Sequence, residues 1–170
     1  MAGYIEGYRK AACLLYEKVI ESGMSPDYIF FPYAFQWRHH LELALKNINV
    51  MGRQLKREAL KPQKNHRLSS LWAEAKVYIA EVIPQNAPEI RNVAFNLREF
   101  EKIDPCADGF RYPMDSNWSA RSLPKAPEWV NLATFHEAMV ALSNFFSCME
   151  IELKARLDYL ASAALDRDRT

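Results

Sequence analysis

The sequence predicts an all-α domain: an antiparallel up-and-down bundle of four to five helices, with a long irregular loop at about residues 104–127. Three observations lead to this class. Apolar residues recur at three- and four-residue steps in five stretches, as on amphipathic helices. Five glycines and nine prolines are few for a chain rich in tight β turns. The chain has 170 residues, 49% of them hydrophobic and 25% charged, which predicts one ordinary globular domain over residues 1–170.

The first two helices follow from their apolar stripes and from the residues that end them. Residues 2–22 carry an amphipathic pattern, and Gly23 is placed to close that helix. The second helix is expected to begin near Pro32 and to end at about residue 60, before Pro62. Gly52 is expected to weaken or bend it.

Helix-start signals place the remaining elements. Asn65 is expected to cap a third helix that ends by Pro84, and the run 86–89 starts a fourth. Residues 104–127 are broken by prolines and turn pairs, with 110–112 as a short extended candidate. A loop of this length inside a compact domain is usually functional or packs like an Ω-loop. The fifth helix is expected from near Pro127 to about Leu160, with a frayed tail at 166–170.

Net charge limits the possible partners. The overall charge is only +1, so the whole surface is not built to attract nucleic acid. Residues 53–67 are nevertheless basic and contain only one acid, Glu58. The basic residues of this tract are Arg53, Lys56, Arg57, Lys61, Lys64 and Arg67. Such a tract can contact phosphates, or it can be a solvated loop.

The sequence disfavours several classes of protein: disulfide-bonded, metal-dependent and membrane proteins. The odd cysteines Cys13, Cys106 and Cys148 form no C-x-x-C pair, and we expect reduced, buried thiols. No H-E-x-x-H, G-x-S-x-G or glycine-rich phosphate loop occurs, and we expect neither a metal nor a cofactor. Without an apolar leader or a stretch of membrane-spanning length, the sequence predicts a cytoplasmic protein with no membrane partner.

The segment with most potential for chemistry is in the second helix. Arg38, Glu42 and Lys46 are spaced by four residues, which places them on one line beside the apolar stripe. Such a line can belong to a binding site, or it can be an ion-pair ladder at the rim of the core. His39 and His40 are adjacent, so their side chains diverge by about 100° and cannot share one metal.

Two further residues complete the candidate set. His66 lies where a helix is expected to start, and a neutral imidazole there can act as a base, although a packing or capping role is commoner. Arg111 lies between two aromatic residues and can hold a carboxylate or phosphate with two hydrogen bonds, or form an ion pair with Glu42 that fixes the loop. A buried Arg requires an acid, so we expect Arg38, Glu42 and Arg111 to lie together, with the loop folded over the second helix.

Four motifs in order carry a resemblance to a known family. They are Arg38-x-x-Leu41-Glu42-Leu43-x-Leu45-Lys46, His66-x-Leu68-x-x-Leu71-Trp72, Asp104-Pro105 and Phe110-Arg111-Tyr112-Pro113. Over roughly residues 5–160 this order resembles the HEPN superfamily (higher eukaryotes and prokaryotes nucleotide-binding). The resemblance implies a helical bundle, a homodimer and, in many members, a metal-independent ribonuclease. The Arg-x4–6-His motif of those ribonucleases is absent.

Three functions follow as hypotheses. The first is a dimeric HEPN-like module that binds RNA or a nucleotide, within a prokaryotic toxin–antitoxin or phage-defence system with an antitoxin as partner. The second is a metal-independent endoribonuclease with a rearranged site that uses Arg38, His39 and His66. The third is a structural protein that dimerises and holds a partner chain. The expected ligand contacts are Glu42, Lys46, Lys56, Arg57, Lys61, Lys64, Arg111 and Tyr112.

Overall fold

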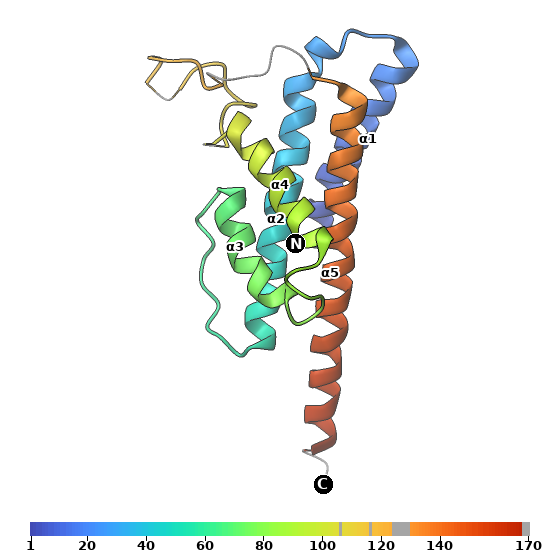
Figure 1. Ribbon diagram of the computed structural model, residues 1–170, viewed down its shortest axis with the longest axis vertical. Coiled ribbons are helices and arrows are strands. Elements are labelled where there is room, and N and C mark those ends of the chain that lie inside the picture. Colours follow the sequence, from blue (N-terminus) through green and yellow to red (C-terminus); the bar gives the residue numbers. More distant parts are fainter. Residues whose placement is uncertain (106, 116, 124–129, 168–170) are drawn as a thin grey trace.

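The computed structural model describes residues 1–105, 107–115, 117–123 and 130–167. Five α-helices pack against each other, and no strand forms in the described ranges (Figure 1). Their bounds are α1 Ala2–Ser22, α2 Phe30–Leu55, α3 Leu68–Ile79, α4 Pro88–Ile103 and α5 Leu132–Arg167, with a short 3₁₀ turn η1 at Pro26–Tyr28. The all-α class and the long loop are as the sequence predicts. No described helix has the length and apolarity needed to cross a membrane.

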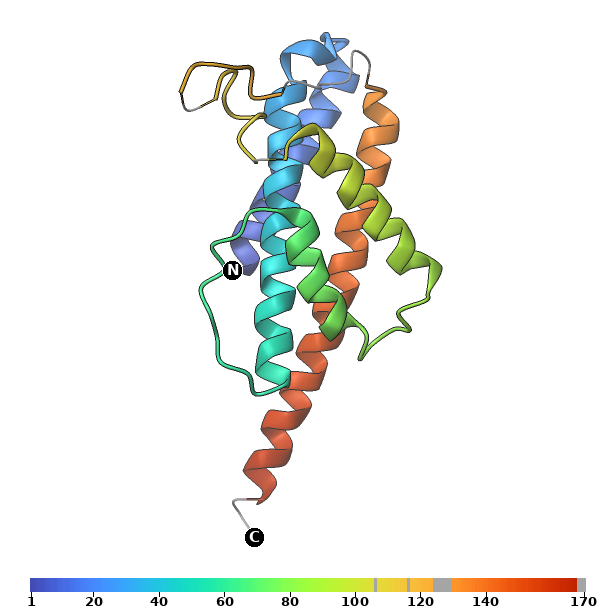
Figure 2. The same cartoon turned by 60° about the vertical axis from the view of Figure 1, so that its left-hand side comes forward.

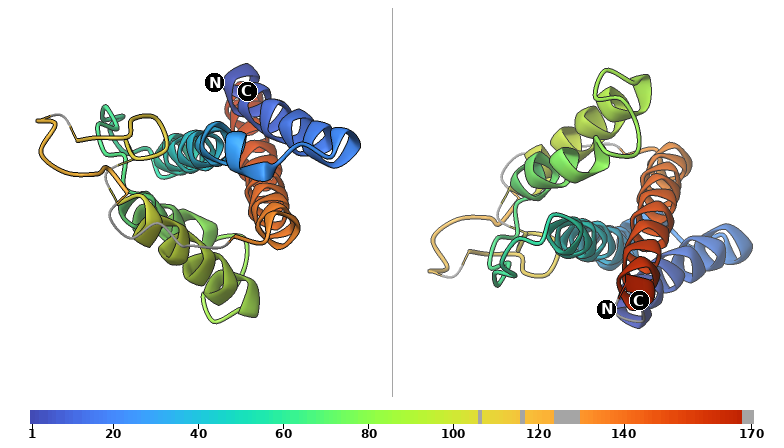
Figure 3. Two further views of the ribbon diagram at one scale, coloured as in Figure 1. Left: turned by 90° about the horizontal axis from the view of Figure 1, so that it is seen from above. Right: turned by 90° about the horizontal axis from the view of Figure 1, so that it is seen from below.

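Helix α2 is the centre of the bundle. It lies between α1, α3 and α5 when the molecule is viewed along its long axis (Figure 3). Its apolar stripe, Trp37, Leu41, Leu45 and Ile48, is completely buried. The stripe repeats every three or four residues, so one face of α2 supplies the core.

The direction of the chain departs from strict alternation at one place. Contacts between α2 and α3 advance together along both helices, from Asn49 with Leu71 to Arg53 with Glu74, so these two helices are parallel. The link 56–67 makes this possible because it returns along the length of α3 before that helix begins (Figures 1 and 2). Twelve extended residues reach about 40 Å, well beyond the roughly 18 Å of a twelve-residue helix.

Helix α2 ends earlier than expected, at Leu55 rather than near residue 60. Arg57 adopts a left-handed conformation with φ of 55°, and its N–H donates to the Gln54 carbonyl. The Glu58 N–H donates to the Arg53 carbonyl. This is a Schellman closure, which usually uses glycine at the left-handed position. Pro62 therefore lies well outside the helix.

Gly52 proves to be a packing position in α2. A Cβ atom built on Gly52 would overlap the Tyr78 ring of α3. The glycine lets α2 and α3 approach closely near their C-terminal ends. The weakening or bending of α2 at Gly52 stays a prediction.

Two helix boundaries and the irregular loop agree with the sequence, whereas the predicted cap of α3 is wrong. Gly23 closes α1 with φ of 65°, and Pro88 begins α4. Residues 104–123 are irregular within the described ranges. Asn65 does not cap α3: its side chain accepts from the Arg67 N–H inside the link, and α3 starts at Leu68 without a side-chain cap of its own.

Other expectations are corrected. Residues 109–111 form a turn rather than an extended segment, because the Arg111 and Tyr112 N–H groups both donate to the Asp108 carbonyl. Helix α5 continues past Leu160 to Arg167, and its expected start at Pro127 lies outside the described residues, as does 168–170 of the tail. Cys13 is half-buried and Cys148 exposed, so neither is a core thiol; Cys106 lies outside the described residues.

Candidate functional site

Glu42 is the centre of a buried ion-pair cluster on α2. Its Oε1 lies 2.7 Å from Lys46 Nζ and 2.9 Å from His66 Nδ1. Its Oε2 lies 3.5 Å from Arg38 Nη1. The line of charges that four-residue spacing predicts therefore forms, and the link brings His66 to it from 24 residues away.

The charge state of Glu42 follows from these partners. Only 3% of Glu42 is exposed, and burial by itself would raise its pKa. Hydrogen bonds and positive charge from Lys46 and His66 outweigh burial and lower the pKa of Glu42 below its ordinary value. The carboxylate is consequently ionised at neutral pH and holds its donors in place.

Arg38 is more buried than a ligand-binding residue should be. Only 1% of it is exposed, and its Nη2 donates to the backbone carbonyl of His66. Burial lowers the pKa of Arg38, and the carboxylates of Glu42, Asp104 and Glu101 oppose that shift. Arg38 therefore fixes the backbone at His66 from inside the protein. The proposal that it contacts a phosphate directly is not supported by this burial.

Two buried acids near Arg38 were not among the predicted site residues. Asp104, 1% exposed, accepts from the N–H groups of Asp108 and Gly109 and so fixes the start of the loop. Glu101, 8% exposed, accepts from the Ser69 N–H and satisfies the N-terminus of α3 from a neighbouring helix. The Asp104-Pro105 pair after a predicted helix was the available sequence signal for the first acid. Glu101 had none.

The two adjacent histidines diverge as predicted. His40 is buried between three helices, with Nδ1 2.9 Å from the Ile5 carbonyl and Nε2 2.9 Å from Ser143 Oγ. His39 is half-buried, with ring contacts to Tyr8 and Phe35. Burial lowers the pKa of His39, although the charge of Glu42 opposes it. His39 thus lies near the ion-pair cluster, whereas His40 belongs to the core.

His66 is the exposed member of the cluster. Its side chain is 63% exposed, and only Nδ1 hydrogen-bonds within the described part of the chain. When Nδ1–H donates to the Glu42 carboxylate, the lone pair of the imidazole is on Nε2, which remains available to a ligand. A carboxylate that orients an imidazole in this way is a common device for general-base catalysis.

The predicted contact between Arg111 and Glu42 is wrong. The Arg111 guanidinium pairs with Asp108 and donates to the Ala107 carbonyl, because the turn at 108–111 brings these groups together. Arg111 also lies over two aromatic rings, 5.7 Å from the centre of Phe35 and 5.4 Å from that of Tyr112. The loop therefore does reach α2, through Phe35 rather than through Glu42.

The basic tract 53–67 divides into paired and unpaired cations. Arg53 pairs with Glu74 at 2.6 Å, Lys56 with Glu81 at 3.2 Å, and Arg67 with Glu101 at 3.6 Å. Three exposed cations have no ion pair in the described ranges, and we call them the link strip: Arg57, Lys61 and Lys64.

The link strip is continuous with the Glu42 cluster. The Lys61 carbonyl accepts from Arg53, and the Gln63 side chain donates to the Lys46 carbonyl. These contacts hold the link along α2 as far as His66. Most of the predicted ligand contacts therefore lie on one side of the bundle, with Lys56 and Arg111 engaged by other acids.

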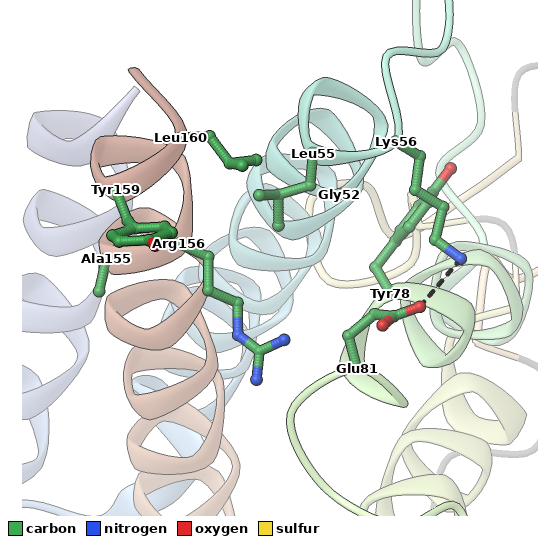
Figure 4. A pocket seen from close by; sticks show the side chains of 9 residues that line it. All are labelled: Gly52, Leu55, Lys56, Tyr78, Glu81, Ala155, Arg156, Tyr159 and Leu160. Carbon is green, nitrogen blue, oxygen red and sulfur yellow. Dashed lines mark ion pairs between the residues drawn. The ribbon is translucent and has the colours of Figure 1, made fainter. Parts of the chain in front are cut away.

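A separate pocket lies near the other end of α2 (Figure 4). Its volume is about 520 Å³, and α2, α3 and α5 each supply part of its wall. Lys56 and Glu81 form an ion pair on one side, while Arg156 points into the gap from α5. Tyr159 and Leu160 of α5 are 72% and 45% exposed beside it. No predicted site residue except Lys56 lines this pocket.

The described residues contain no group of three His, Cys, Asp or Glu side chains that could hold a metal ion. Comparison with family models, curated proteins and solved structures gives no match. Fold and site together define a five-helix bundle with an Arg–Glu–Lys–His cluster around the buried Glu42 carboxylate, next to the link strip.

Proposed function

We propose that this protein is an RNA-binding module of HEPN-like architecture that contacts phosphates through the link strip, with Lys46 and His66 behind it. The observation that carries the proposal is the division of the basic tract. Glu74, Glu81 and Glu101 neutralise three of its cations. Arg57, Lys61 and Lys64 remain exposed on one continuous segment. Cations without internal partners can exchange bound counterions for backbone phosphates.

RNA fits this strip better than a small nucleotide does. The three cations are spread along an extended link rather than around one pocket, which suits successive phosphates of a strand. The net charge of +1 gives little long-range attraction, so modest affinity is expected. The HEPN resemblance supports nucleic acid, and it also carries the proposals of a toxin–antitoxin or phage-defence context and of an antitoxin-like protein partner.

Salt dependence tests the proposal. We expect the affinity for a labelled single-stranded RNA to fall as salt rises, measured by fluorescence anisotropy. Replacing Arg57, Lys61 and Lys64 by Gln should reduce the slope of log K against log salt by about 2, because each lost phosphate contact contributes about 0.7. Circular dichroism should show an unchanged fold, since all three side chains are exposed.

A variant of equal charge change provides the control. Lys10, Lys18 and Lys154 are exposed on α1 and α5, and replacing them by Gln should leave the slope within error. Equal slopes for the two triple variants would show that only total charge matters. Absence of RNA binding by the wild-type protein at low salt would contradict the function itself.

A second candidate function, metal-independent RNA cleavage, is favoured by the Glu42–His66 contact. His66 Nε2 would take the proton from a ribose 2′-hydroxyl, whose oxygen attacks the adjacent phosphorus while the 5′-oxygen leaves with a proton from water. The nearby ammonium of Lys46 would stabilise the charge that develops on phosphate. We expect a 2′,3′-cyclic phosphate product that EDTA does not suppress and that His66→Gln abolishes. Cleavage that persists in His66→Gln excludes this mechanism.

We also propose a homodimer, formed at the end of α5. The helix extends beyond the rest of the bundle (Figures 1 and 2), and its last turns expose Tyr159, Leu160 and Leu165. These exposed apolar residues lie within two turns of one helix, and exposed apolar area of this kind favours association. Light scattering of the wild type should give twice the chain mass of 19.7 kDa. Leu160→Glu should give the mass of a single chain. If the wild-type protein dimerises without binding RNA, a structural, partner-holding function is favoured instead.

A further inference from the structure

The loop between α4 and α5 contains a small, well-bonded hairpin. Met114 and Arg121 form an antiparallel bridge, and the Asp115 N–H donates to the Ala120 carbonyl at 2.9 Å. The Asp115 carboxylate accepts from both the N–H and the hydroxyl of Ser119, at 2.8 and 2.7 Å. These bonds fix the turn within the part of the loop that projects from the bundle (Figures 1 and 2).

The hairpin presents Trp118 to solvent. Trp118 is 78% exposed, and its φ of 55° lies in the left-handed region that bulky residues rarely adopt. Its N–H donates to the Asp115 carbonyl at 3.0 Å, so the turn imposes this conformation. An indole is normally buried for its large apolar area, whereas here backbone bonds hold one outward. An indole held outward in this way is available to a partner from outside the chain.

Two hollows adjoin this indole. The larger, about 610 Å³, is lined by Trp118, Tyr112 and Arg121 among others. The second, about 430 Å³, shares Tyr112 and Arg121 with the first and adds Arg111. Aromatic and guanidinium side chains therefore line one surface, together with the carboxylates of Asp108 and Asp115.

This surface is connected to the Glu42 side of α2. Arg111 contacts both Tyr112 and the Phe35 ring of α2. Phe35 in turn packs against His39, one turn further along the helix. The charges of Glu42 and Lys46 act on the pKa of His39, so His39 lies close to the ion-pair cluster. A strand bound along the link strip and past His66 can thus continue towards the hairpin.

We propose that Trp118 and Tyr112 stack unpaired bases of the RNA, while Arg121 contacts a flanking phosphate. This inference rests on the proposed RNA-binding function and deepens it, because it specifies single-stranded RNA. Aromatic rings interleaved with cations are the usual means of binding single strands without sequence preference. Bases inside an A-form duplex are stacked on each other and are not available to an indole.

Substitution of Trp118 tests the proposal. Trp118→Ala should weaken binding of an unstructured RNA by about 5- to 150-fold, the cost of one lost base stack. The salt slope should stay the same, because no phosphate contact is removed. Trp118→Phe should recover most of the affinity, and binding of a duplex of the same sequence should not respond to either variant. Tyr4→Ala, which removes a similarly exposed aromatic from α1, is the matched control.

A spectroscopic readout locates the contact. The chain has four tryptophans, and only Trp118 differs between the wild type and Trp118→Phe, so subtracting the emission of the variant from that of the wild type isolates this indole. Single-stranded RNA should quench this difference signal. Salt-dependent RNA binding with no quenching, and equal affinities for Trp118→Ala and Tyr4→Ala, would overturn the stacking proposal and leave the proposed function intact. No RNA binding by the wild type would overturn both.

Discussion

Glu42 Oε1 lies 2.9 Å from His66 Nδ1, and this contact joins the middle of α2 to the end of the link. Arg38 strengthens the same junction from inside, by donating to the His66 carbonyl. The link is therefore held at the end that carries the only exposed ring of the cluster. One carboxylate both stabilises the fold and orients the residue best placed to meet a ligand.

Replacing Glu42 by Gln should destabilise the protein by about 3–5 kcal/mol. The substitution preserves size but leaves the guanidinium of Arg38 buried without its nearest counter-charge, and the penalty for such an uncompensated charge is large. Urea unfolding followed by circular dichroism measures the change. Glu99→Gln is the matched control, because Glu99 makes only an exposed ion pair with Lys102, at 2.6 Å. Its effect should be within about 0.5 kcal/mol. Equal effects of the two substitutions would show that the cluster contributes no special stability.

Asp104→Ala should loosen the long loop at its origin. The Asp104 carboxylate accepts from two successive N–H groups, those of Asp108 and Gly109, and losing both bonds should cost about 1–3 kcal/mol. Limited proteolysis should then cut within residues 107–123 faster than in the wild type. Asp158→Ala, an exposed change on α5, should leave the cleavage rate unchanged. An unaltered rate in Asp104→Ala would mean that other contacts fix the loop.

Two glycine-to-alanine substitutions should have opposite signs. Gly52→Ala places a methyl group against the Tyr78 ring, and the overpacking should cost about 1–3 kcal/mol. Gly7→Ala, within α1, meets nothing within 4 Å and should stabilise by about 0.5–1 kcal/mol. Thermal unfolding of both variants measures the contrast. Stabilisation by Gly52→Ala would mean that α3 can move away from α2 at no cost.

Local signals in the sequence were enough to predict most of the helices and part of the site. Gly23 and Pro88 mark boundaries through their own backbone preferences, which no tertiary contact has to supply. The line of Arg38, Glu42 and Lys46 follows from helical geometry alone. These features depend on residues within a few positions of one another.

Features that depend on distant contacts could not be predicted in the same way. Arg57 ends α2 in a conformation usually given to glycine, so residue type did not mark the boundary. His66 meets Glu42 because the link returns along α3, and the length of a link does not specify its path. Arg111 had several acids within reach, and the turn selected Asp108 because it lies three residues away.

The stability of the bundle should fall on mild acidification, and His40 should account for part of the fall. Burial lowers the pKa of His40 below its ordinary value of 6.5, despite its bond to the Ile5 carbonyl. As pH falls through about 6.5, the unfolded chain gains a proton at this residue and the folded chain does not. The unfolded state is thereby favoured, so stability present above pH 6.5 is lost as the pH falls towards the lowered pKa. Burial lowers the pKa of His39 and His136 as well, so they act in the same direction.

Comparison of His40→Asn with the wild type isolates the part of the acid-induced loss of stability that is due to His40. Asparagine cannot titrate, and its amide can still donate to the Ile5 carbonyl that Nδ1 contacts at 2.9 Å. Free energies of unfolding from urea titrations at pH 7.5, 6.5 and 5.5 should show a smaller loss on acidification in the variant. The difference in slope should be at most about 1.4 kcal/mol per pH unit, the limit for one proton. The variant should be less stable at pH 7.5, because Ser143 Oγ loses its partner, so the slope rather than the baseline is the readout. Parallel pH profiles would show that the folded protein accommodates a charged His40, contrary to its burial between α1, α2 and α5.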